Sequence, residues 1–182
     1  MEEKELFPGV VLYSNVLDDI DGLLSYMKDS SASDKWKHDT WPDHRNPGKL
    51  SRSYHQYVLF KNDDFAVSVL DKIKKLDEIL LDYCKKYDVE LLEHETPRAM
   101  IYEPGCFFGA HKDDTFSHPR RVSTVLYIND DYTGGEIFFP LINLRIQPKK
   151  NEFLVFPSAY LFTHEVSEVR DADRFVIVGF GK

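Results

Sequence analysis

The sequence has few cysteines, no excess of basic residues and no long apolar runs. Its two cysteines, Cys84 and Cys106, cannot make a disulfide framework. The acidic start MEEKELFPG lacks an apolar signal core, and no run reaches the length that spans a bilayer. The formal net charge of −8 argues against a general role with nucleic acid, because phosphate binding needs a basic face. We therefore expect a cytoplasmic protein with no membrane and no nucleic acid among its partners.

The chain does have enough apolar and aromatic side chains to bury a core, at 42% hydrophobic and 14% aromatic residues. A length of 182 residues is most simply one domain, residues 1–182. Within it, the residue pattern changes near position 96. We expect residues 1–95 to supply helical support and a substrate loop, and residues 96–182 to form a β-rich core. The sequence leaves the oligomeric state open.

Helical periodicity is confined to the N-terminal half. Apolar residues repeat at helical spacing over residues 16–28 and again, as one longer helix, over residues 65–87. Asp63 and Asp64 precede the second helix and are N-cap candidates, since a short carboxylate can accept hydrogen bonds from free backbone N–H groups. These helices are predicted to support a sheet.

Residues 29–56, between the two helices, are rich in Ser, Asp, Pro and Asn and include Trp36 and Trp41. We predict a long loop here. One interpretation is a lid or substrate-binding loop, in which Trp36, Trp41 and Tyr54 form one wall of a groove. The other is a surface excursion that its tryptophans pin to the core.

Short strands separated by turn signals dominate the C-terminal half. Their spacing is typical of a sandwich or barrel, and the lack of helical segments between them argues against a parallel sheet. The predicted fold class is α+β, mainly β. The expected strands cover residues 98–103, 121–128, 136–140, 143–146, 153–156, 164–166 and 174–180.

A candidate metal site begins in the stretch MIYEPGCFFGAHKDD. His111 and Asp113 are two residues apart, so on a strand they project to the same face. His164, later in the chain, supplies a third candidate ligand. Two histidines and one carboxylate leave adjacent coordination positions open, which is the arrangement of non-heme iron(II) oxygenases. Each histidine alone is more simply a hydrogen-bonded or surface residue, and only the combination favours a metal.

Arg174 follows His164 by ten residues, at the start of an apolar strand. A planar guanidinium matches a carboxylate in bidentate fashion, so Arg174 is a candidate anchor for a dicarboxylate whose other end binds the metal. The alternative is an exposed ion pair with Asp171 or Asp173. Tyr102 and Tyr127 are candidate hydroxyl donors to the same carboxylate, or else core aromatics.

Residues 97–180 resemble the iron(II)- and 2-oxoglutarate-dependent dioxygenase superfamily, and its prolyl 4-hydroxylase branch most. The resemblance implies a double-stranded β-helix (jelly roll) core with N-terminal supporting helices. It also implies iron(II) bound by His111, Asp113 and His164, and 2-oxoglutarate anchored by Arg174 with help from Tyr102. The matching segments are YEPGCFFGAHKDD, RRVSTVLYINDDYTGGEIFFP, IQPKKNEFLVFPS and HEVSEVRDADRFVIVGF.

The activity that this resemblance implies is hydroxylation of an unactivated C–H bond with O2, releasing succinate and CO2, with ascorbate supporting turnover. The expected reaction is prolyl 4-hydroxylation of a peptide or protein. The alternatives are the same chemistry on a free amino acid or other small molecule, and a non-catalytic metal-binding jelly-roll module. A zinc hydrolase with the same ligands would not need Arg174.

Five residues are expected to contact substrate. The resemblance puts Arg121 and Arg52 at positions where basic residues hold the peptide in prolyl hydroxylases. Phe108 and Phe180 stand where the family has Tyr and Trp, so they retain apolar walls without the polar groups. Trp41 is expected to add an aromatic wall from the 29–56 stretch.

Overall fold

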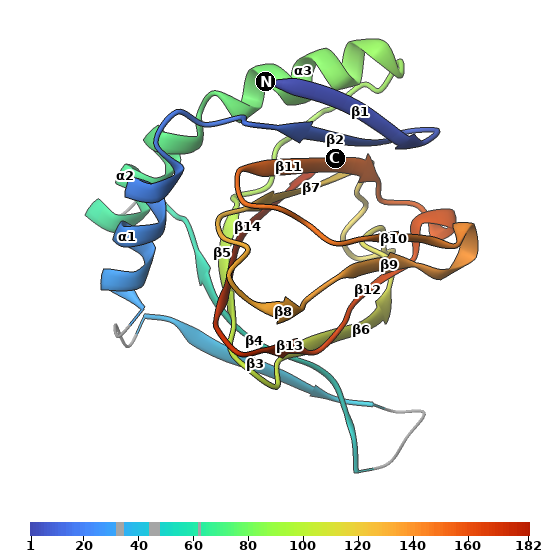
Figure 1. Cartoon of the computed structure of the whole chain (residues 1–182). Coiled ribbons are helices and arrows are strands. Elements are labelled where there is room, and N and C mark those ends of the chain that lie inside the picture. The colour runs from blue at the N-terminus through green and yellow to red at the C-terminus, as the bar shows by residue number, and fades with distance from the viewer. Residues whose placement is uncertain (32–34, 44–47, 62) are drawn as a thin grey trace.

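A strongly curved, nearly closed antiparallel sheet forms the body of the molecule, with three helices packed along one outer side (Figure 1). This arrangement is seen in a computed structural model that describes residues 1–31, 35–43, 48–61 and 63–182. It agrees with the expected α+β, mainly β jelly roll. None of the helices formed by the described residues combines the length and apolar character that crossing a membrane requires.

Each of the first two helices begins at an aspartate. α1 (Ile20–Ser30) starts after Asp19, which accepts a hydrogen bond from Gly22 N at 2.9 Å. α2 (Asp64–Ile73) starts after Asp63, which accepts from Ala66 N at 2.8 Å, as the N-cap prediction expects. α3 (Leu76–Lys86) follows directly. The prediction of one continuous helix over 65–87 was wrong, because the chain breaks at 74–75 and buries two separate apolar faces.

The strands are short and mostly joined by tight turns. In chain order they are β1 (Glu2–Phe7), β2 (Val10–Ser14), β3 (Lys37–Pro42), β4 (Leu50–Val58), β5 (Arg98–Tyr102), β6 (Phe107–His111), β7 (Val122–Tyr127), β8 (Thr133–Gly134), β9 (Ile137–Phe139), β10 (Leu144–Ile146), β11 (Glu152–Pro157), β12 (His164–Val166), β13 (Val169–Arg170) and β14 (Arg174–Gly181). The seven strands expected after residue 96 are all present, to within two residues at each end.

The main sheet runs β1-β2-β11-β7-β14-β5-β4-β6-β12-β9-β10, with β3 paired to β4, while β8 and β13 form a separate pair. The middle of this path places β5 between β14 and β4. Arg174 lies opposite Tyr102, and Val178 opposite Arg98, in the β14–β5 register. Because side chains alternate along a strand, every second residue of these strands faces the barrel interior.

The alternation produces two apolar clusters. One contains Phe175 and Ile177 of β14 and packs beneath the helices, together with Trp36 and Leu23. The other fills part of the barrel interior and contains Val176 and its neighbours on β5 and β7. A single strand therefore seals the helical layer with one face and lines the interior with the other.

The loop predicted over residues 29–56 is largely a hairpin. β3 and β4 pair from Lys37–Gln56 to Pro42–Leu50, whereas positions 32–34 and 44–47 of the predicted loop lie outside the described residues. The sequence hid these strands because their inner face is polar. Arg52, Tyr54 and Gln56 point into the cavity described below, so the apolar alternation that indicates a strand is missing.

Candidate active site

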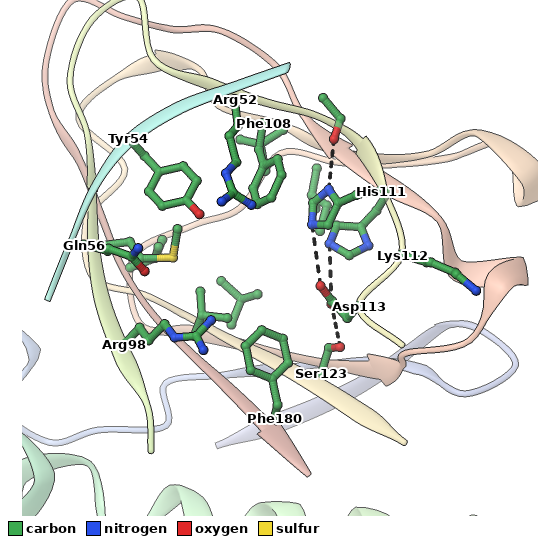
Figure 2. A pocket seen from close by; sticks show the side chains of 18 of the residues that line it. Arg52, Tyr54, Gln56, Arg98, Phe108, His111, Lys112, Asp113, Ser123 and Phe180 are labelled. Carbon is green, nitrogen blue, oxygen red and sulfur yellow. Dashed lines mark hydrogen bonds and ion pairs between the residues drawn. The ribbon is translucent and has the colours of Figure 1, made fainter. Parts of the chain in front are cut away.

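A cavity of about 470 Å³ occupies the barrel interior, and the close-up in Figure 2 shows it ringed by side chains from β4, β5, β6, β7 and β14. His111 and Asp113 lie on one side of this ring, Arg52 and Tyr54 on a second, and Arg98 and Phe180 on a third. The exposed ring of Trp41 is part of the lining, so the cavity reaches the surface.

The three predicted metal ligands converge in this cavity. His111 ends β6 and His164 begins β12, and the register pairs these two residues directly. Asp113 lies two residues beyond the end of β6, in a bend, so the strand geometry expected for the His-x-Asp pair holds only for the histidine. Nε2 of His111 lies 3.5 Å from Asp113 Oδ1, and Nε2 of His164 lies 3.7 Å from Oδ2. One ligand atom from each of the three residues falls within 4.8 Å of the others.

The groups behind the ligands fix their orientation. Nδ1 of His111 lies 2.9 Å from Gly109 O, and Nδ1 of His164 lies 3.0 Å from Phe162 O. With Nδ1 protonated, each ring donates to a carbonyl and keeps the Nε2 lone pair for the common point. Ser123 donates to Asp113 Oδ2 at 2.6 Å and holds the carboxylate in the same way.

The protonation states of His164 and Asp113 also favour a bound cation. Burial lowers the pKa of His164 to about 4, so this imidazole is neutral near pH 7. Burial alone would raise the pKa of Asp113, but the two histidines and the Ser123 hydroxyl outweigh it and hold this pKa below its usual range. The donor set is thus two imidazole nitrogens and one carboxylate, which fits iron(II).

Arg174 is enclosed at the other end of the cavity, with 2% of its surface exposed. Its Cζ lies 4.8 Å from the centre of the Tyr102 ring and 5.3 Å from that of Tyr127. Burial would lower the pKa of Arg174, but the facing tyrosines, Tyr132 among them, raise it above its ordinary value. We call these four residues the arginine–tyrosine cluster. Among the described residues, neither Asp171 nor Asp173, the alternative partners, forms an ion pair with Arg174.

Several polar atoms of this cluster have no hydrogen-bond partner among the described residues. Nε and Nη1 of Arg174, and the hydroxyls of Tyr127 and Tyr132, are buried without a hydrogen bond to any described residue. A buried cation is costly unless an anion and further hydrogen bonds offset its desolvation. A carboxylate would satisfy the guanidinium and both hydroxyls together, so the cluster fits one end of a dicarboxylate such as 2-oxoglutarate.

Sequence reasoning missed Tyr132 and Gly135. The segment DYTGG was interpreted only as a turn before a strand, yet Gly135 has φ of +63° and lies against the cluster. A Cβ there would come within 2.8 Å of Arg174 Cδ and 2.8 Å of Tyr132 Cε2. The glycine therefore makes room for the anchor, and a tyrosine beside paired glycines was the available signal.

The β3–β4 hairpin forms the wall that carries Arg52. The guanidinium of Arg52 lies 4.7 Å from the centre of the Trp41 ring and donates to both carboxylate oxygens of Asp39, at 3.1 and 3.2 Å. Asp39 also accepts from the Tyr54 hydroxyl at 3.2 Å and from Gln56 Nε2 at 3.0 Å. Asp39 thus holds three lining residues in place, and sequence reasoning did not single it out.

The opposite wall of the cavity contains Phe180. The predicted substrate residue Arg121 is not part of this wall. Arg121 is exposed and does not belong to the described residues that line the cavity; its neighbour Arg120 does. Both arginines precede β7, so the alternation that turns Ser123 and Val125 inward does not extend to them, and Arg120 is the one that reaches the cavity. Arg120 Cζ lies 3.6 Å from the centre of the Phe180 ring.

The remaining predicted aromatic residues divide between cavity and core. The Phe108 ring stacks on His111, with ring centres 3.6 Å apart, and lines the cavity as expected. Trp36 instead packs on Tyr57 beneath the helices, with ring centres 5.6 Å apart. Of the three residues proposed for a groove wall, Trp41 and Tyr54 reach the cavity and Trp36 serves as a core anchor.

Comparison with known proteins agrees with this geometry. Residues 97–182 match the family model described as the 2OG-Fe(II) oxygenase superfamily. A PKHD-type hydroxylase of Prochlorococcus marinus (strain NATL2A) is 35% identical over 82 residues, 42% of this chain and 36% of the relative. A putative prolyl 4-hydroxylase of Acanthamoeba polyphaga mimivirus is 23% identical over 120 residues, 59% of this chain and 46% of the relative. The matched region thus spans less than half the length of these curated relatives.

Solved structures share the fold over nearly the whole chain. A prolyl hydroxylase of Trichoplax adhaerens, in complex with a hypoxia inducible factor peptide fragment, superposes with a TM-score of 0.77 at 19% identity, over 95% of this chain and 83% of that one. A Pseudomonas putida prolyl-4-hydroxylase gives 0.75 at 20% identity, over 96% and 92%. The double-stranded β-helix fold is confirmed, and residues 97–182 are similar in sequence to the 2OG-Fe(II) oxygenase superfamily.

Proposed function

We propose that this protein is an iron(II)- and 2-oxoglutarate-dependent dioxygenase that hydroxylates prolyl residues of a peptide or protein. The observation that carries the proposal is the presence, in one cavity, of two complementary sites. The ligands His111, Asp113 and His164 suit iron(II), and the buried arginine–tyrosine cluster suits the far carboxylate of 2-oxoglutarate. A metal-binding module or a zinc hydrolase would use the first site and have no need of the second.

The chain's own residues contribute position and shielding. His111 and His164 present their Nε2 atoms, and Ser123 holds the Asp113 carboxylate toward them. Arg174 orients the dicarboxylate from the buried end. When bound, iron(II) and 2-oxoglutarate supply the activation of O2, with succinate and CO2 as co-products. Apolar lining residues between the two sites, including Met100 and Val176, exclude water from the reacting region.

A polypeptide substrate is supported by the shape of the cavity and by its relatives. The exposed Trp41 ring and the Arg52 wall lie where the cavity meets the surface, which leaves room for an extended chain. The curated relatives and solved neighbours are named as prolyl or PKHD-type hydroxylases. The alternative substrate is a free amino acid or other small molecule, which the experiment below separates.

The test measures succinate formed from 2-oxoglutarate by anaerobically purified protein given iron(II), ascorbate and O2. Proline-containing peptides, free L-proline and no substrate form the three arms, and His111→Ala is the control. We expect peptide-stimulated succinate and a gain of one oxygen on proline in the wild type only. Stimulation by L-proline alone would replace the peptide by a small molecule. Equal succinate in the His111→Ala protein would contradict the proposed metal site.

A further inference from the structure

The cavity is basic although the chain is acidic. Its described lining carries one carboxylate, Asp113, which belongs to the metal site, whereas the whole chain has 31 Asp and Glu against 23 Lys and Arg. Apart from Arg174, the cationic lining residues form a set that we call the cationic rim: Arg52, Arg98, Lys112 and Arg120. Cations gathered in a low-dielectric cleft favour an anionic ligand.

Within the cationic rim, two arginines already have close carboxylate partners. Arg52 donates to Asp39 at 3.1 Å, and Arg120 donates from Nε and Nη2 to the two oxygens of Glu95 at 2.8 and 2.7 Å. These bidentate pairs largely neutralise both guanidinium groups. Their role is to hold the walls of the cavity, and they leave little attraction for a further anion.

Arg98 differs from these two. Among the residues that the structure describes, Glu95 is its one ionic partner, at 3.7 Å, which is too long for a hydrogen bond. Glu95 is shared further with Lys182, also at 3.7 Å. One carboxylate thus serves three cations, and of these only Arg120 forms hydrogen bonds with it. Figure 2 shows its guanidinium beside Phe180, facing the open centre of the cavity.

The position of Arg98 separates it from the 2-oxoglutarate anchor. Arg98, Met100 and Tyr102 are alternate residues of β5 that face the cavity, so Arg98 and Tyr102 lie about 13 Å apart at ~3.3 Å per residue. Arg98 pairs with Val178 of β14, two residues before Phe180, and Phe180 pairs with Ser123, the residue that holds Asp113. Arg98 therefore lies near Phe180, away from the arginine–tyrosine cluster.

We propose that Arg98 binds a carboxylate of the substrate and so selects substrates that carry a negative charge close to the hydroxylated residue. This inference rests on the proposed function for the identity of the reaction, but not for the binding. The carboxylate has two sources: an acidic side chain within a polypeptide, or the main-chain carboxylate of a chain terminus or free amino acid. A charged hydrogen bond of this kind is expected to change affinity about ten- to a hundredfold.

The test uses fluorescein-labelled twelve-residue peptides with one central proline in an Ala/Gly/Gln background. Each position within four residues of the proline carries Glu in one peptide and Gln in its pair. Anisotropy gives the dissociation constants with the iron- and 2-oxoglutarate-loaded protein held without O2, and mass spectrometry after adding O2 reports hydroxylation. A second set ends in a free acid or an amide, and L-proline and its amide are used as competitors.

We expect Glu to bind at least about tenfold tighter than Gln at one or two positions in the wild type. The preference should vanish in Arg98→Gln, and in Arg98→Glu it should reverse, so that Gln binds tighter than Glu at the same positions. Arg170→Gln, which removes an exposed charge on β13, should keep it, and the requirement for 2-oxoglutarate should stay unchanged in all three. A free-acid or L-proline preference that depends on Arg98 would assign the carboxylate to the main chain.

Two results would overturn the inference. One is equal binding of every acidic and neutral pair, terminal pairs included. The other is a preference that persists in Arg98→Gln. Failure of the proposed function looks different, because Arg98-dependent binding without oxygen added to proline would keep the carboxylate site and reject prolyl hydroxylation. Hydroxylation of proline at equal rates in acidic and neutral peptides would keep prolyl hydroxylation and reject the carboxylate site at Arg98.

Discussion

The two ends of the cavity are built differently. The arginine–tyrosine cluster is buried, and several of its polar atoms have no hydrogen-bond partner among the described residues. At the cationic rim, Arg52 and Arg98 keep 25% and 33% of their side-chain surface exposed, and Trp41 keeps 52% of its surface exposed. A fixed small dicarboxylate can be matched by a rigid, buried site. A longer and more variable substrate needs a wall that stays open to solvent.

The largest expected effect comes from the metal site between these ends. Asp113→Ala should reduce turnover by more than about a hundredfold, since even outer-shell changes at metal sites cost 10–100-fold. Succinate formation and iron binding measure it. Thermal unfolding is the control, and a folded variant with wild-type turnover would remove Asp113 from the ligand set.

The second-largest effect is expected from Arg174→Ala, which removes the cation of the arginine–tyrosine cluster. Loss of two hydrogen bonds to a charged group, at about 1.5–3 kcal/mol each, raises the 2-oxoglutarate requirement about a hundredfold or more. Peptide affinity at the cationic rim should change little, because the two ends are separate. Titration of 2-oxoglutarate at saturating peptide measures the concentration of 2-oxoglutarate that each variant requires. A shift in peptide affinity alone would reverse the assignment of the two ends.

Tyr132→Phe tests the arginine–tyrosine cluster by removing a single hydroxyl oxygen. We expect the 2-oxoglutarate requirement to rise about tenfold, because the buried hydroxyl is removed without loss of the ring. Tyr160→Phe, at an exposed tyrosine, is the matched control. If both variants behave like the wild type, Tyr132 only packs against Arg174.

Asp39→Asn tests the rim without touching the enclosed end. The variant weakens the ion pair to Arg52, which is part-exposed, so we expect a rise of only about three- to tenfold in the KM for peptide. The KM for 2-oxoglutarate should stay constant. A change in the latter would mean that the hairpin and the buried cluster are coupled.

The smallest effect concerns stability at the rim. Hydrogen bonds from Arg120 lower the pKa of Glu95 against the opposing effect of burial. Because this pKa is lower in the folded than in the unfolded chain, the stabilisation is present above the unfolded value of about 4.3 and is lost as the pH falls through the folded value. Glu95→Gln should therefore lower the free energy of unfolding by about 1 kcal/mol at pH 7 and by nothing near pH 3. Urea titrations at both values measure it, and an equal loss at both would exclude an ionic origin.

The sequence predicts the enclosed end better than the open one. Turn signals mark the strands after residue 96, and the order of His111, His164 and Arg174 resembles that of a known superfamily, so their convergence could be predicted. Tyr132 and Gly135 were missed because their role depends on how the turn after β7 folds onto Arg174 of the neighbouring strand β14. At the rim, the polar inner face of β4 removed the apolar alternation that indicates a strand. Arg120 faces inward in place of Arg121 because both residues precede β7 and do not follow its alternation, which the sequence alone does not reveal.

The alternation along β14 also limits how this protein can evolve. Arg174, Val176, Val178 and Phe180 all face the cavity from one strand, and the intervening residues seal the helical layer. Inserting or deleting one residue within the strand would turn every later side chain to the wrong face. New substrate preferences are therefore accessible through substitutions at positions such as 98 and 180, or through the length of the β3–β4 hairpin, while the spacing between the two ends is inherited unchanged.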